Sequence, residues 1–228
     1  MGSRQSPIGQ GTAAVALRLP DRFPRSLKVG FWICIVIAVA VVIRRLIALA
    51  TSSSSSAPPQ LAALDTWFTQ HAALTYVHIL CALAFVLLLP LLFWRRTRDS
   101  VLLTRAIFPL GAVVGLTAYG MSIYAVGGWV ERAAVLFFDT LYLFALYRAF
   151  SFFRTGNRPQ LQRWMLRAIA ILLGIATVRP VMGVFFATSR LTHLTPQQFF
   201  GIAFWIGWSI NTIAIELWLR TRGKTAFA

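Results

Sequence analysis

The chain has 228 residues, of which 58% are hydrophobic and 12% are charged. A mean hydropathy of +0.71 and several apolar runs of transmembrane length exclude an ordinary soluble domain and predict a helical protein that crosses a membrane several times. The formal net charge of +16 comes from Lys and Arg residues that stand between the apolar runs. Such residues set the topology and contact anionic head groups, so we expect the lipid bilayer, and not nucleic acid, as the partner.

The first part of the chain is predicted to hold a tail, one helix and a linker. Residues 1–28 are polar, basic and rich in proline, which indicates a disordered cytoplasmic tail. The apolar run that follows predicts a first transmembrane helix at 29–50. An outer linker that begins with a serine run continues to residue 71, and we expect its last part to lie at the membrane interface with Trp67 as an anchor.

Five further spans are predicted to form an all-α transmembrane bundle over residues 72–220, followed by a basic tail at 221–228. We place these spans at 72–94, 106–126, 133–150, 164–186 and 199–219. The third span of the chain carries Gly111-x-x-x-Gly115, a pattern of small residues that lets helix backbones approach closely. We therefore expect the bundle to form around the third and fifth spans.

The distribution of basic residues predicts the orientation. Most of the 22 Lys and Arg residues lie in the N-terminal tail, in the loops after the second and fourth spans, and at the C-terminus. Because cytoplasmic segments carry an excess of Lys and Arg, both termini are predicted to be cytoplasmic. Arg44 and Arg45 then fall on the outer side, and we expect their side chains to extend to the outer head groups.

A cation inside the fifth span, Arg179, needs a partner, because an arginine at that depth costs at least about 2.5 kcal/mol in hydrocarbon. Three other polar residues, His78, Tyr119 and Asp139, lie at a similar distance from the outer ends of their spans, roughly 9–12 Å. Asp139 is the acidic residue among them, so we predict that it contacts Arg179. The four residues are our candidates for a polar pocket in the outer half of the bilayer.

Two interpretations of this layer stay open. In one, Arg179 binds an anion or a carbonyl group and His78 handles a proton. In the other, the charges neutralise each other and only fix how the helices pack. Arg167, Asn211 and Glu216 are candidates for structural polar contacts, and we expect Asn211 to join helices. Glu216 pairs either with Arg220, four residues later, or as a buried partner with Arg167 or Arg148.

Four stretches resemble a bacterial family of predicted membrane proteins, the domain of unknown function 2306. They are LTYVHIL (74–80), RWMLR (163–167), TVR (177–179) and Asn211 followed by Glu216. The resemblance covers roughly residues 65–220 and implies a multi-pass protein of the bacterial inner membrane without an assigned activity. Members of this family usually carry two further histidines, at places where this chain has Ser100 and Leu161. If those histidines bind haem or a metal, this chain lacks two of them.

The sequence thus leaves several functions open. One is a membrane redox subunit that binds haem or quinone, and another is a small transporter or an accessory subunit. A b-type haem between helices commonly needs two axial histidines, and the chain offers His71, His78 and His193, of which the first two lie on one segment. We therefore predict no cofactor, with haem b as the alternative, and no metal, since no CxxC or HExxH motif occurs.

Overall fold

The computed structural model describes residues 16–17, 24–50, 71–92, 94, 96–97 and 100–221. Within these residues the secondary structure is entirely helical, with α1 (Arg25–Ala50), α3 (Ala72–Leu88), η1 (Pro90–Leu92), α4 (Val101–Ser122), α5 (Gly128–Arg154), α6 (Arg158–Thr192) and α7 (Pro196–Thr221). Six helices in the described part are long and apolar enough to span a membrane, which confirms the predicted six-span all-α bundle.

Three sequence predictions fall largely outside the described residues: the N-terminal tail, the outer linker with Trp67, and the tail after Thr221. Of the expected tail, residues 16–17 and 24–28 are described: Ala16 and Leu17 are buried, and Arg25 to Lys28 form the first turn of α1. The Leu17 N–H donates a hydrogen bond of 2.9 Å to Thr104 Oγ1 near the start of α4. The prediction of disorder is therefore wrong for Ala16 and Leu17, and also for Arg25 to Lys28, because α1 begins four residues before the predicted first helix.

Several helices are longer than the apolar runs that predicted them. The side chain of Asn157 caps the start of α6 by accepting a hydrogen bond from Gln160 N, and His193 ends the helix in the left-handed conformation with φ 52°. At 35 residues, α6 is about 52 Å long and extends well beyond a hydrocarbon core of roughly 30 Å. The segment 187–198, which lies between the predicted fifth and sixth spans, is therefore helical except at residues 193–195.

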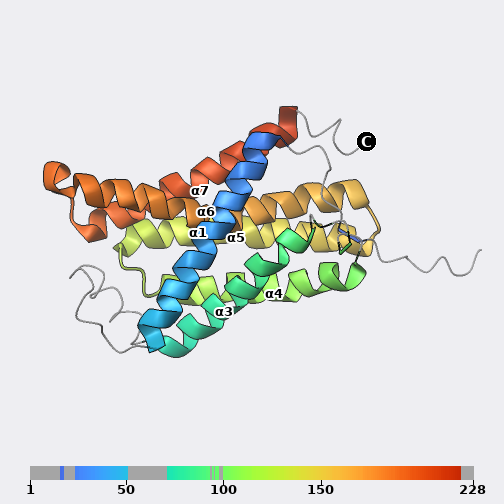
Figure 1. The fold of residues 1–228 in the computed structure, drawn as a ribbon, viewed down its shortest axis with the longest axis horizontal. Helices are drawn as coiled ribbons and strands as arrows, with labels where there is room; N and C mark the ends of the chain where they lie inside the picture. The colour runs from blue at the N-terminus through green and yellow to red at the C-terminus, as the bar shows by residue number, and fades with distance from the viewer. Residues whose placement is uncertain are drawn as a thin grey trace, which may run out of the picture.

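Helices α5 and α6 lie at the centre of the bundle (Figure 1). Helix α5 packs against α4, α6 and α7, and α6 packs against α1, α5 and α7, whereas α4 packs chiefly against α3 and α5. Helix α1 crosses the bundle obliquely and contacts α6 and α3. The prediction that α4, the third span, is central is therefore wrong, while that for α6, the fifth span, holds.

Glycines set the closest helix contacts. A Cβ atom at Gly111 on α4 would lie 2.7 Å from the Tyr142 hydroxyl of α5 and 2.9 Å from the Phe85 ring of α3. Between α6 and α7 the contact is with the backbone itself: a Cβ at Gly207 would lie 2.6 Å from Val178 N and 2.7 Å from Val178 Cα. Small residues thus let α7 lie directly on the segment of α6 that leads to Arg179.

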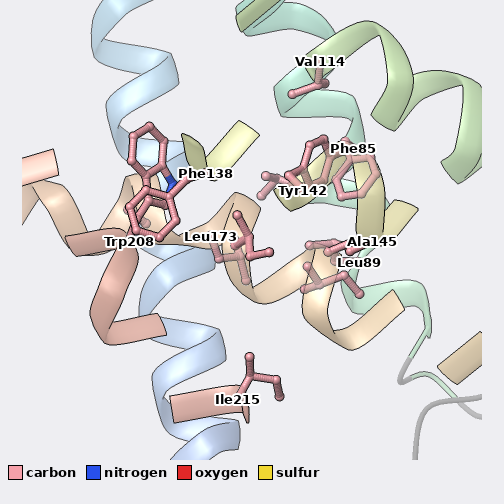
Figure 2. Packing of buried hydrophobic residues seen from close by; sticks show 14 of the residues in the cluster. Phe85, Leu89, Val114, Phe138, Tyr142, Ala145, Leu173, Trp208 and Ile215 are labelled. Atoms are coloured by element: carbon pink, nitrogen blue, oxygen red, sulfur yellow. The ribbon is translucent and has the colours of Figure 1, made fainter. Parts of the chain in front are cut away.

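Aromatic residues fill the space between these helices (Figure 2). The rings of Phe138 on α5 and Trp208 on α7 stack with centroids 5.5 Å apart. Figure 2 shows Tyr142 beside Phe85, and the Tyr142 hydroxyl donates a hydrogen bond of 3.0 Å to the Gly111 carbonyl. These contacts hold α5 against both α4 and α7, so the side chains of α5 have fixed positions.

We predict that Gly207→Ala lowers stability by about 1–3 kcal/mol, because the added methyl group meets backbone atoms of α6 that can move only with their helix. Gly183→Ala is the matched control, since a Cβ there meets nothing within 4 Å. Thermal unfolding of both purified variants in detergent checks this. Equal melting temperatures for the two would contradict the close α6–α7 packing.

Candidate functional site

A cavity of about 250 Å³ lies among α1, α3, α4, α5, α6 and α7, with largely apolar walls. It is situated toward the end of the bundle at which α1 ends and α3 and α5 begin. Five side chains that can carry charge line it: Arg45 from α1, His78 from α3, Glu131 and Asp139 from α5, and Arg179 from α6. Three of the four predicted pocket candidates thus line one cavity.

Arg179 is half-buried in the wall of this cavity. No hydrogen bond or ion pair to its guanidinium is recorded among the described residues. Its charge is attracted by Glu131 and repelled by Arg45 and Arg44. The cation therefore lines a largely apolar cavity, and an anion that enters the cavity would offset its charge.

Glu131, which the sequence analysis assigned no role, is the acid that acts on Arg179. It is 8% exposed, and one of its carboxylate oxygens accepts a hydrogen bond from Gly127 N at the start of α5. A carboxylate in the first turn also interacts favourably with the helix dipole. A glycine pair followed closely by a glutamate before an apolar run is a helix-start pattern, and it is the signal by which Glu131 could have been found.

The predicted contact between Asp139 and Arg179 is wrong. No ion pair or hydrogen bond joins them, and Asp139 is not among the charges that act on Arg179. Depth counted from helix ends assumes helices of equal length that stand upright, and α6 at 35 residues breaks that assumption. Asp139 still lines the cavity, but apart from Arg179.

The other two candidates make contacts between helices. His78 Nδ1 lies 2.9 Å from Thr117 Oγ1, which joins α3 to α4, while the residue also lines the cavity. The hydroxyl of Tyr119 on α4 shares a hydrogen bond with Thr140 on α5, and Tyr119 is not part of the cavity wall. Tyr119 is therefore placed between helices rather than in the cavity.

The three histidines lie apart from one another. His71 stacks on Tyr124, with ring centroids 3.6 Å apart, and His193 lies in the turn between α6 and α7. Only His78 among them lines the cavity. No group of three or more potential metal-ligating residues occurs in the part of the chain that the structure describes. A haem in this cavity would thus have one histidine available to it, His78.

The predicted structural polar residues lie at the opposite end and in the middle of the bundle. Arg167 on α6 binds Glu216 on α7 through two hydrogen bonds of 2.8 and 3.0 Å, while Arg220 lies 3.6 Å from the same carboxylate. Asn211 on α7 accepts a hydrogen bond of 2.8 Å from Thr177 and donates one of 3.3 Å to the Ala170 carbonyl, both on α6. These residues join α6 to α7.

A comparison of double-mutant cycles tests the corrected pairing. We predict that Glu131→Gln and Arg179→Gln show a coupling of roughly 0.5 kcal/mol or more in thermal stability, whereas Asp139→Asn and Arg179→Gln add within about 0.5 kcal/mol. The direct pair Arg167 and Glu216 serves as the positive control for the same substitutions. Coupling of Asp139, but not of Glu131, with Arg179 would restore the original prediction and contradict the structure.

The comparisons with known proteins bear on this site. The family model described as "Predicted membrane protein (DUF2306)" matches residues 75–219, which is more than half of the chain. The match includes His78, Glu131, Asp139 and Arg179, but α1 with Arg45 lies outside it. No curated protein and no solved structure matches the chain. The chain belongs to the DUF2306 family of predicted membrane proteins.

Proposed function

We propose that this membrane protein binds a small amphipathic ligand in the cavity, with an anionic group of the ligand at Arg179. The observation that supports this most directly is the guanidinium of Arg179, which lines the cavity without donating a hydrogen bond to any described residue. In hydrocarbon such a cation is costly unless an anion or water meets it. A carboxylate or phosphate is the group that a guanidinium binds best, through two parallel hydrogen bonds.

The surroundings of Arg179 favour an added negative charge. Arg45 and Arg44 carry charges of the same sign as Arg179, and Glu131 carries the opposite charge. Glu131 is also engaged with Gly127 N, so it does not reach Arg179 as a direct ion pair. A ligand anion between the helices would pair directly with Arg179, which no side chain in the described part of the chain does.

The apolar walls indicate what the remainder of the ligand is like. Most of the lining consists of aliphatic and aromatic side chains, for example Val86, Val135 and Phe204. Ligand cavities typically combine such walls with a few placed polar groups, and the polar groups fix the orientation of the ligand. A molecule with an anionic head and an apolar body matches this combination.

The first test uses decanoate as the probe and the full-length protein in nanodiscs. We predict that Arg179→Gln weakens decanoate binding, measured by isothermal titration calorimetry, by on the order of tenfold or more, because a charge-assisted pair is lost. Arg154→Gln, an exposed arginine at the other end of α5, is the matched control and should bind as wild type does. Unchanged binding in Arg179→Gln would refute the proposal.

The cavity is proposed to lie in the outer half of the bacterial inner membrane. The excess of Lys and Arg on the opposite side of the bundle supports this orientation. We predict that a reporter fused after Ala228 is active only in the cytoplasm. Activity of a reporter that works only outside the cytoplasm would invert the orientation and place the cavity on the cytoplasmic side.

A further inference from the structure

The carboxylate of Asp139, which has no part in the proposed anion site, indicates a further property of the proposed ligand. Asp139 is 8% exposed and lines the same cavity as Arg179. Its Oδ2 atom is fully buried and has no hydrogen-bond partner. The other buried polar atoms without a partner among the described residues belong to His71, Arg132 and Arg148, none of which lines the cavity. Asp139 is thus the one such residue in the described chain that faces this space.

The neighbours of Asp139 do not supply a donor. Tyr142, one turn further along α5, is near enough to feel the charge of Asp139, but its hydroxyl donates to the Gly111 carbonyl. Phe138, the preceding residue, stacks on Trp208. Burial of a carboxylate is unfavourable unless a donor meets it, so a donor on a molecule that fills the cavity would stabilise Asp139.

Asp139 and Arg179 need two different groups on the ligand. The acid that acts on Arg179 is Glu131, and Asp139 follows it by eight residues on α5, a rise of about 12 Å. Asp139 itself makes no ion pair or hydrogen bond with Arg179. Because Arg179 and Asp139 both line the cavity without joining each other, the cavity offers one polar group that favours an anion and another that favours a hydrogen-bond donor.

We propose that Asp139 binds a hydrogen-bond donor, a hydroxyl or ammonium group, at the end of the ligand remote from its anionic group. The ligand class is then an apolar chain or ring system with a polar group at each end. This inference rests on the proposed function, since it assumes that the ligand enters the same cavity. Asp139 acts here as a specificity determinant, because an amphiphile with only an anionic head leaves its carboxylate without a partner.

The test compares three probes on the full-length protein in nanodiscs: decanoate, ω-hydroxydecanoate and ω-aminodecanoate. We expect at least one of the two bifunctional probes to bind on the order of tenfold more tightly than decanoate to the wild type, since hydrogen bonds to a buried charge are the strong ones. In Asp139→Leu this advantage should disappear while decanoate still binds. Tyr147→Leu, an exposed residue of α5, is the control and should keep the advantage.

The variants and probes separate the outcomes. Asp139→Asn retains an acceptor oxygen but loses the negative charge. This variant should therefore still prefer the hydroxyl probe to decanoate, but it should no longer prefer the amino probe. It replaces Asp139→Leu if that variant does not fold. Equal binding of all three probes to the wild type would overturn this inference and leave the proposed function intact. If none of the three probes binds to the wild type, both this inference and the proposed function are overturned.

Discussion

The structure depends on one constraint: a charged side chain inside a membrane must be paired or hydrogen-bonded, because hydrocarbon does not solvate it. Arg167 and Glu216 show the complete solution, a bidentate ion pair between α6 and α7. Arg179, on the same helix about three turns further along, makes no ion pair with a described residue, although the charge of Glu131 acts on it, and it faces a cavity. The contrast between two arginines of one helix is what distinguishes a structural contact from a candidate binding site in this protein.

Close helix packing places the charged residues around the cavity. Gly207 lies against the backbone of Val178, the residue before Arg179. A Cβ atom added at Gly201 would lie 2.9 Å from the backbone nitrogen of Glu131. Helix α7 thus contacts α6 next to Arg179 and α5 at Glu131. Helix α1 completes the wall with Arg45, although it lies outside the segment that the family model matches. The family core therefore supplies most of the site, and α1 adds a second cation.

Hydropathy predicted all six spans, because the cost of placing a residue in lipid accumulates along the chain and needs no knowledge of neighbours. It did not predict that α6 continues to Thr192, since caps such as Asn157 and the turn at His193 decide where a helix ends. The Gly111-x-x-x-Gly115 pattern predicted a close contact but not how many helices surround α4. The prediction that Arg179 contacts Asp139 was wrong because residue counts give neither the tilt of a helix nor the direction in which a side chain points.

The central claim is that the cavity at Arg179 holds a ligand anion. An experimental structure of the wild-type protein purified in native lipids, with nothing added, tests it most directly. The account predicts density that belongs to no protein atom within hydrogen-bond distance of the Arg179 guanidinium and extending along the apolar walls toward Asp139. A direct ion pair between Arg179 and Glu131, with the cavity closed by side chains, would contradict it.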